Sequence, residues 1–203
     1  MRGVYLVTPN WDDTDRLLDV TEQALREGVA LLQYRHKNAD EALRREQAAA
    51  LRLLTRKYGV PFIVNDVLAL CEEVDADGVH VGGTDISVAE ARSRLGKNKL
   101  VGASCYGDLA LARAAKEQGA SYMAFGGFYP SLVKQYPVTT DPDIVVQAKR
   151  EIDLPCVVIG GMTPENAAPL AARGADMVAA ISSVYLATAP DIAVQEFNQL
   201  FAG

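Results

Sequence analysis

Short apolar runs and amphipathic stretches alternate strictly along the whole chain. Several runs are almost continuously apolar, as expected of strands that helices cover on both faces. Alternation of this kind predicts parallel strands, because a helical connection returns the chain to the same end of the sheet. We expect strands near residues 4–8, 31–36, 61–65, 78–82, 100–105, 122–128, 155–160 and 177–182.

Helices are expected between these strands, and their ends carry recognisable signals. Thr163 followed by Pro164 supplies a capping hydroxyl and a proline at the first helical position. Asp40 and Asp108 are placed to cap two other helices. Glycines that tolerate the backbone typical of helix ends follow four segments, at Gly28, Gly59, Gly119 and Gly174. We expect helices near 13–27, 40–58, 67–73, 87–95, 108–118, 141–151, 164–173 and 190–201.

Eight strand–helix units predict one domain over residues 1–203, folded as a closed (β/α)8 TIM barrel. An open doubly wound sheet is the alternative, although it usually has fewer strands. The composition, with 49% apolar and 23% charged residues, is that of an ordinary globular domain and shows no linker. The longest irregular connection spans residues 131–141, a length typical of functional loops.

Charge and cysteine content exclude several classes of protein. The formal net charge of −6 argues against broad binding to nucleic acids or anionic membranes, which favour a basic surface. No apolar run approaches the roughly 18 residues of a membrane span, and the first one is too short for a signal peptide. Three dispersed cysteines without a CxxC pair indicate a reduced protein, so we expect a cytoplasmic location.

Polar side chains at the carboxyl ends of the expected strands are the candidates for chemistry, because ligands bind there in barrels. After the second strand, alternation places Gln33, Arg35 and Lys37 on one face, where they would form an anion site. After the third and fourth strands, Asp66 and Asp85 could share Mg²⁺, which usually takes one or two carboxylates plus water and phosphate.

The remaining strand ends differ in how much chemistry they suggest. After the fifth strand, Ser104 could orient a substrate, whereas Cys105 has no activating histidine nearby in the sequence and is interpreted as packing. His80 lies in the middle of a strand and is more typical of a core side chain than of a catalyst. The glycines after strand seven and the serines after strand eight match the phosphate site of barrels.

These motifs, in this order, resemble those of the thiamine-phosphate synthase family, which joins the two heterocycles of thiamine. The resemblance runs from residue 4 to about residue 185. It rests on QYRHK at 33–37, VND at 64–66, ADGVHVGGTD at 76–85, GAS at 102–104, a lysine at 134, VIGGMTPENAAPL at 158–170 and GADMVAAIS at 174–182. The fold of that family is also a (β/α)8 barrel.

The resemblance implies condensation of an aminopyrimidine diphosphate with a thiazole phosphate, plain or carboxylated, through a pyrimidinylmethyl cation. Mg²⁺ would be the cofactor, held by Asp66 and Asp85. The catalytic residues would be Arg35, Lys37, Ser104 and Lys134. The pyrimidine diphosphate would bind Gln33, Arg35, Lys37, Asn65, Ser104 and Lys134, and the thiazole phosphate would bind Ser131, Val133, Gly161, Ile181 and Ser182. The family commonly has a hydroxyl residue where this chain has Val133.

Two other functions are compatible with a phosphate-binding barrel. One is a thiazole tautomerase-like paralogue, and the other is a non-catalytic regulatory barrel that binds a phosphate ligand. Neither needs two candidate metal ligands, such as Asp66 and Asp85, together with the cationic pair Arg35 and Lys37. The expected partners are therefore the two small phosphorylated substrates, without nucleic acid or membrane, and a homo-oligomer is possible.

Overall fold

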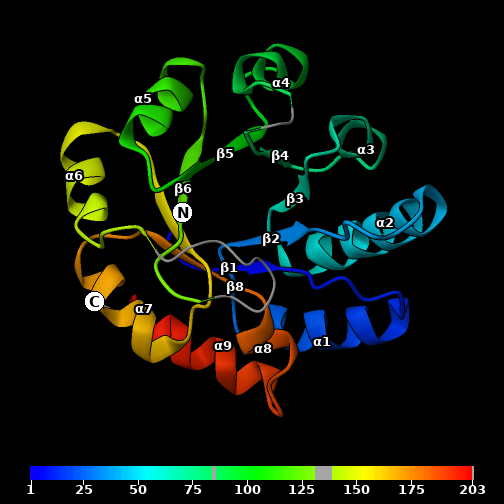
Figure 1. Cartoon of the computed structure of the whole chain (residues 1–203). Helices are drawn as coiled ribbons and strands as arrows, with labels where there is room; N and C mark the ends of the chain where they lie inside the picture. Colours follow the sequence, from blue (N-terminus) through cyan, green and yellow to red (C-terminus); the bar gives the residue numbers. More distant parts are fainter. Residues whose placement is uncertain (84–85, 131–138, 203) are drawn as a thin grey trace.

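The structure is a computed structural model that describes residues 1–83, 86–130 and 139–202, and it contains the expected closed barrel. Eight parallel strands pair in chain order, and the last closes against the first (Figure 1). An open sheet is thereby excluded. The strands are β1 (Gly3–Val7), β2 (Leu31–Tyr34), β3 (Phe62–Asn65), β4 (Gly78–Val81), β5 (Leu100–Tyr106), β6 (Tyr122–Gly126), β7 (Cys156–Ile159) and β8 (Met177–Ala180).

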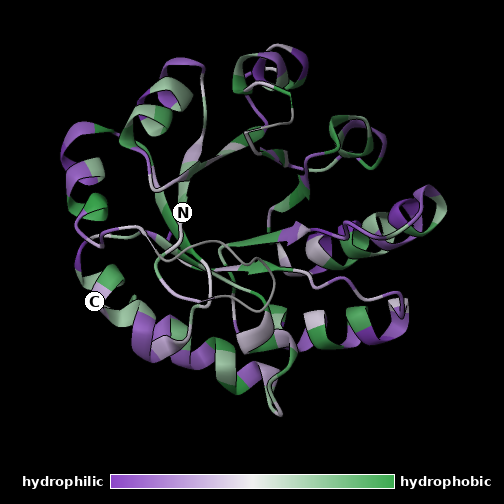
Figure 2. Ribbon diagram, in the orientation of Figure 1, coloured by the Kyte–Doolittle hydropathy of each residue, from purple (hydrophilic) through white to green (hydrophobic). Residues whose placement is uncertain are grey.

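Helices surround the barrel and turn their polar faces outward, as Figure 2 shows. The caps expected from the sequence are confirmed: Asp40 and Asp108 each accept a backbone N–H, and Thr163 forms a reciprocal capping box with Asn166. No helix in the described ranges has the length and apolar character needed to cross a membrane. The helices are α1 (Thr14–Arg26), α2 (Glu41–Tyr58), α3 (Leu68–Glu73), α4 (Val88–Leu95), α5 (Leu109–Glu117), α6 (Ile144–Glu151), α7 (Pro164–Ala172), α8 (Ser182–Tyr185) and α9 (Pro190–Gln199).

The short helix α8 was not expected from the sequence, which predicted a strand up to residue 182. The ladder between β1 and β8 has its last pair at Leu6 and Ala180, so the next residue has no strand partner. The chain turns at Ile181, whose carbonyl oxygen accepts from the N–H groups of Val184 and Tyr185. Ser182 is therefore the first residue of a helical turn that faces the carboxyl end of the barrel.

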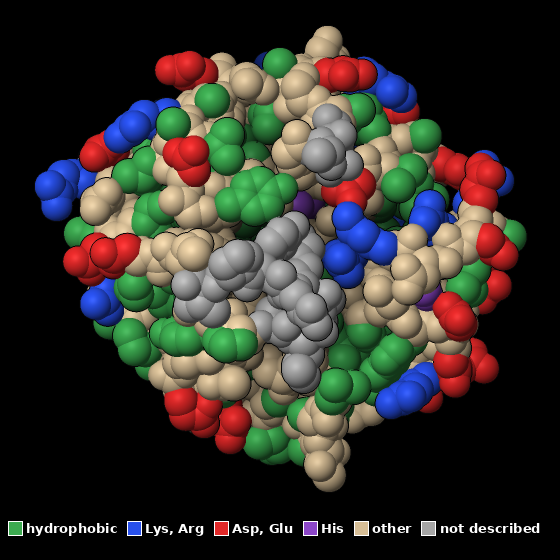
Figure 3. Space-filling model, in the orientation of Figure 1, with side chains coloured by type: hydrophobic (Ala, Val, Ile, Leu, Met, Phe, Trp, Pro, Cys, Tyr) green, Lys and Arg blue, Asp and Glu red, His purple; other side chains and the backbone are tan. Residues whose placement is uncertain are grey.

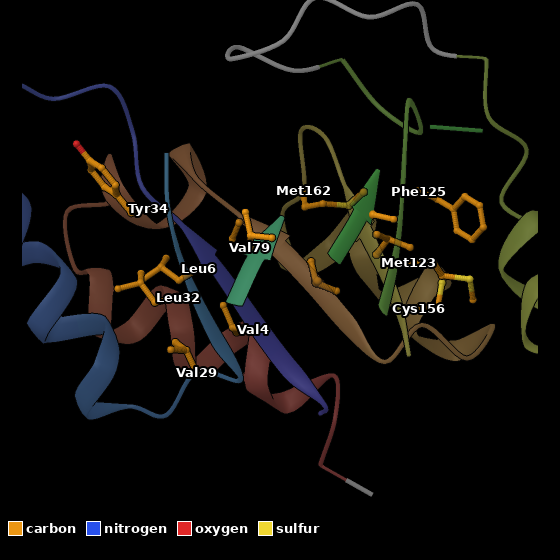
Figure 4. Packing of buried hydrophobic residues seen from close by; sticks show 14 of the residues in the cluster. Val4, Leu6, Val29, Leu32, Tyr34, Val79, Met123, Phe125, Cys156 and Met162 are labelled. Carbon is orange, nitrogen blue, oxygen red and sulfur yellow. The ribbon is translucent and has the colours of Figure 1, made fainter. Parts of the chain in front are cut away.

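Alternation along each strand divides the core into two layers. In β1, Val4 and Leu6 point outward and pack under the helices, in the larger cluster that Figure 4 shows. Tyr5 and Val7 point inward and contribute to a second cluster, which fills the barrel lumen. The lumen cluster consists of Tyr5, Val7, Leu31, Ile63, Tyr122, Ala124, Val157, Met177 and Ala179.

A glycine in β5 makes room for Tyr122, one of the two tyrosines of the lumen. A Cβ atom placed on Gly102 would lie 2.0 Å from Cζ of Tyr122, well inside van der Waals contact. The Tyr122 ring thus occupies the space that any other residue at position 102 would fill. It lies fully buried below the carboxyl end of the barrel.

At the opposite, amino end of the barrel, polar side chains hold neighbouring strands together. Asp77, directly before β4, accepts the backbone N–H of Phe62 at 2.7 Å and a bidentate contact from Arg52. Asp176, directly before β8, accepts the N–H of Cys156 at the same distance. These carboxylates accept backbone donors at the starts of β3 and β7.

Candidate active site

A cavity of about 300 Å³ opens at the carboxyl ends of the strands. Figure 3 views this end of the molecule, where basic side chains gather beside the centre. Nine of the thirteen residues proposed from the sequence line this one cavity: Gln33, Arg35, Lys37, Asn65, Asp66, Ser104, Gly161, Ile181 and Ser182. The other four, Asp85, Ser131, Val133 and Lys134, lie outside the described residues.

The end of β2 supplies the basic side of the cavity. Gln33, Arg35 and Lys37 all line it, although the strand expected up to residue 36 ends at Tyr34 and only Gln33 lies within it. Gln33 and Arg35 are only 5% and 8% exposed, whereas the Lys37 side chain is half exposed. The Arg35 backbone is held on both sides by Thr8, whose hydroxyl accepts the Arg35 N–H at 2.8 Å and contacts its carbonyl oxygen. The Arg35 backbone is thus fixed just beyond the end of β2, and the residue lines the cavity.

Asp66, at the end of β3, is held in an uncommon conformation. Its φ of +61° lies in the left-handed region, which costs about 1–3 kcal/mol for a residue other than glycine. Lys37 Nζ lies 3.2 Å from its Oδ2 atom, and the Asn65 amide donates to the same oxygen at 2.6 Å. Backbone strain of this kind clusters at functional sites. In this conformation the Asp66 carboxylate lies at the edge of the cavity.

The donor set around Asp66 fits a hard cation that is completed by a ligand. Within residues 1–83, 86–130 and 139–202, no group of three or more His, Cys, Asp or Glu side chains could hold a metal. Mg²⁺ does not require such a group, because it keeps several waters and takes substrate phosphate oxygens. One carboxylate beside two cationic side chains is therefore compatible with a metal-bound diphosphate.

The opposite side of the cavity is built from glycines and helix starts. Gly161 has a φ of +61°, and a Cβ atom there would lie 2.0 Å from the carbonyl oxygen of Pro130. Only glycine permits this approach of two loops. Asn166 donates to the Gly161 carbonyl oxygen, and Ser182 begins α8 beside it. Helix starts carry N–H groups without intrahelical acceptors, so this side suits a phosphate.

Two residues of the site were missed or undervalued in the sequence. His80 is buried and hydrogen-bonded, as expected of a core side chain, but it also lines the cavity, with Nε2 2.9 Å from Ser104 Oγ. Tyr106 lies at an irregularity of β5 with a φ of +52°, and its hydroxyl accepts the Gly83 N–H at 3.2 Å. No pattern singled out Tyr106, since a tyrosine after a buried strand is common.

The interpretation of Cys105 as a packing residue agrees with its surroundings. The side chain is fully buried, and it does not line the cavity. Burial raises the pKa of the Cys105 thiol to about 12, so the nucleophilic thiolate is not populated at neutral pH. The site therefore offers cations, an amide, a hydroxyl and backbone donors, and Cys105 does not serve it as a nucleophile.

Comparisons with known proteins agree with this chemistry. The family model described as thiamine monophosphate synthase matches residues 4–184. A thiamine-phosphate synthase of Janthinobacterium sp. (strain Marseille) is 63% identical, over 100% of this chain and 98% of its own length. One from Thiobacillus denitrificans is 51% identical, over 98% and 95%.

Solved structures give the same result. The thiamine phosphate pyrophosphorylase from Pyrococcus furiosus superposes with a TM-score of 0.85 at 29% identity, covering 98% of this chain and 94% of that one. A 3-hexulose-6-phosphate synthase superposes with a TM-score of 0.72 at 17% identity, which reflects the barrel fold alone. The family match and the residues that line the cavity thus both indicate a site for phosphorylated substrates.

Proposed function

The chain belongs to the thiamine monophosphate synthase family and is a transferase that makes thiamine phosphate. We propose how the residues of its cavity carry out this transfer. The proposed substrates are an aminopyrimidine whose methylene group carries a diphosphate and a thiazole that carries a phosphooxyethyl group, plain or carboxylated. The products are thiamine phosphate and diphosphate. The three buried, unpaired cysteines support a reducing, cytoplasmic location.

One observation carries the proposal: a single cavity has a cationic side and a backbone-donor side. Arg35 and Lys37 stand on the first, together with Gln33, Asn65 and Ser104. Gly161 and the start of α8 form the second. Two anionic substrates that must react with each other need two anion sites that share one space. A volume of about 300 Å³ is at the lower end of the range for small-molecule sites.

In the proposed reaction, the bond between the pyrimidinylmethyl carbon and the diphosphate oxygen breaks, and both electrons leave with the diphosphate. Arg35, Lys37 and Lys134 neutralise the charge that develops on this leaving group. The ring amino group stabilises the cation that remains. The lone pair of the thiazole nitrogen then forms the new carbon–nitrogen bond, so no enzyme nucleophile is required.

Mg²⁺ would be held by Asp66 and Asp85 and would supply further positive charge to the diphosphate. The residues of this chain carry out the positioning. Asn65 and Lys37 orient the Asp66 carboxylate through the contacts described above. Gln33 and Ser104 bind the pyrimidine ring, and Gly161, Ile181 and Ser182 hold the thiazole phosphate, with Ser131 and Val133 beside it. Close packing of both substrates excludes water, which would otherwise capture the cation.

The test is an assay of the purified protein with both substrates and Mg²⁺. We expect release of diphosphate that depends on the thiazole phosphate and that EDTA abolishes. Isomerisation of a thiazole phosphate without diphosphate release would instead identify a tautomerase. Binding of either phosphate ligand without any turnover would identify a regulatory barrel.

A further inference from the structure

Five side chains from five different strands form one continuous chain of hydrogen bonds at the base of the cavity. Gln33 Nε2 donates to the Tyr5 hydroxyl at 2.6 Å, and this hydroxyl lies 2.6 Å from that of Tyr122. The Tyr122 hydroxyl lies 3.2 Å from His80 Nδ1, and His80 Nε2 lies 2.9 Å from Ser104 Oγ. We call these residues, Gln33, Tyr5, Tyr122, His80 and Ser104, the floor chain.

Tyr122 is the one member of the floor chain that does not line the cavity. Its ring contacts Tyr5 edge to face and lies stacked near His80, and it fills the space left by Gly102. It is fully buried, so it meets no ligand. Any effect of Tyr122 on a ligand must therefore pass through its neighbours.

One order of the hydrogen atoms in the floor chain gives both tyrosine hydroxyls an acceptor. Burial raises the pKa values of Tyr5 and Tyr122, so both hydroxyls keep their hydrogen at neutral pH. A buried hydroxyl hydrogen needs an acceptor. Since Gln33 donates to Tyr5, the order that gives both hydroxyls an acceptor runs from Tyr5 to Tyr122 and from Tyr122 to His80 Nδ1. His80 then carries its hydrogen on Nε2 and donates to Ser104.

This order defines what the two ends offer to a ligand. Ser104 keeps its hydroxyl hydrogen as a donor, and Gln33 keeps its amide oxygen as an acceptor. Reversing the order would turn the Gln33 amide over and move every hydrogen along the chain. The two ends, which make no direct contact with each other, therefore change together.

We propose that Tyr122 is a positioning residue that couples Gln33 to Ser104, so that the pair presents a matched acceptor and donor to the edge of the pyrimidine ring. The inference rests on the proposed function, because an amino group beside an unprotonated ring nitrogen is the edge that such a pair complements. Tyr122 has no part in binding the diphosphate or the thiazole.

The first test is Tyr122→Phe, which removes one hydroxyl and splits the floor chain into two parts. The probe is the aminopyrimidine alcohol, which lacks the diphosphate and cannot react, titrated by calorimetry. We expect its affinity to fall about threefold to tenfold, as for the loss of one hydrogen bond. The affinity for inorganic diphosphate, measured with Mg²⁺, should not change.

The control is Tyr185→Phe, which also removes a buried tyrosine hydroxyl. This hydroxyl lies 2.8 Å from the Thr21 hydroxyl and is not part of the floor chain. Both variants should lower the melting temperature, but only Tyr122→Phe should weaken binding of the alcohol. An equal loss of affinity in both variants, or no loss in Tyr122→Phe, would overturn the inference.

A double-mutant cycle tests the coupling itself. In the native background, the effects of Gln33→Ala and Ser104→Ala on the affinity for the alcohol should not add, and in the Tyr122→Phe background they should. Additive effects in both backgrounds would overturn the coupling. The proposed function fails separately: a native protein that binds no aminopyrimidine, or that does not turn over the two substrates, contradicts that function.

Discussion

Lys37 Nζ lies 3.2 Å from Asp66 Oδ2, so a single ammonium group contacts the candidate metal ligand and lines the proposed diphosphate site. A cation bound at Asp66 would replace one positive partner of this carboxylate with another. Lys37 would then be released toward the phosphate oxygens. Lys37 and Asp66 therefore act together, and substitution of each residue tests its contribution separately.

The first prediction concerns the carboxylates of Asp66 and Asp85. Asp66→Asn keeps the shape of the side chain but removes its charge, so it should lower turnover by orders of magnitude at limiting Mg²⁺. Asp85→Asn should behave similarly. The measurement is the initial rate as a function of Mg²⁺ concentration. Asp153→Asn, at an exposed residue outside the cavity, is the control. Unchanged rates in both site variants would refute the metal assignment.

The second prediction concerns the cationic side chains. Removing Arg35, Lys37 or Lys134 by substitution with alanine should reduce kcat about 10²–10³-fold, as for the loss of one group that stabilises developing charge. The KM for the thiazole phosphate should change much less. Lys57→Ala, at an exposed pair with Glu22, should leave the kinetics as they are. A Lys134→Ala variant that alters only the thiazole KM would contradict the assignment to the leaving group.

The third prediction concerns Val133, where the resemblance to the thiamine-phosphate synthase family implies a hydroxyl residue. Val133→Thr would add a side-chain donor, and a hydrogen bond is worth about 0.5–1.5 kcal/mol to a neutral acceptor and about 1.5–3 kcal/mol to a charged one. We therefore expect the thiazole phosphate to bind severalfold more tightly, with the KM for the pyrimidine diphosphate unaltered. Equal thiazole affinities would mean that the native contact is made by the backbone.

The fourth prediction concerns packing in the lumen. Gly102→Ala would place a Cβ atom 2.0 Å from the Tyr122 ring, so either the ring or the strand must move. Overpacking of this kind destabilises by about 1–3 kcal/mol, which thermal unfolding would detect. Gly28→Ala is the control, since a Cβ atom there meets nothing within 4 Å and only backbone strain remains. A Gly102→Ala variant as stable as the native protein would show that the lumen can expand.

The fifth prediction concerns alkaline pH. Burial raises the pKa of the Cys71, Cys105 and Cys156 thiols from about 9 to about 12. The unfolded chain loses these protons first, so their contribution to stability is fully present below pH 9 and is lost as pH rises toward 12. The free energy of unfolding should decline across that window, measured by urea denaturation. In Cys105→Ala the decline should be shallower.

The sequence predicted the fold and much of the site because both follow from strand periodicity. Gln33, Arg35 and Lys37 line one cavity as predicted, although Arg35 and Lys37 lie in the segment that follows β2 rather than in the strand itself. The contacts that run between strands were not predictable in this way. Tyr122 contacts His80 and Tyr5 only because the barrel closes and brings their strands together. A single histidine within a strand does not indicate such contacts in the sequence. Helix α8 was missed because the end of the ladder with β1 leaves no local signal.

The carboxylates Asp77 and Asp176 tie β3 and β7 to their neighbours at the end of the barrel away from the cavity. The amino ends of the strands are therefore anchored by carboxylates, whereas the cavity lies at their carboxyl ends. Amide exchange with deuterium should be slowest near the anchored rim and faster toward the loops, even without substrate. A barrel held in this way tolerates change around the cavity, because a side chain there can be replaced without loosening the strands at their anchored ends.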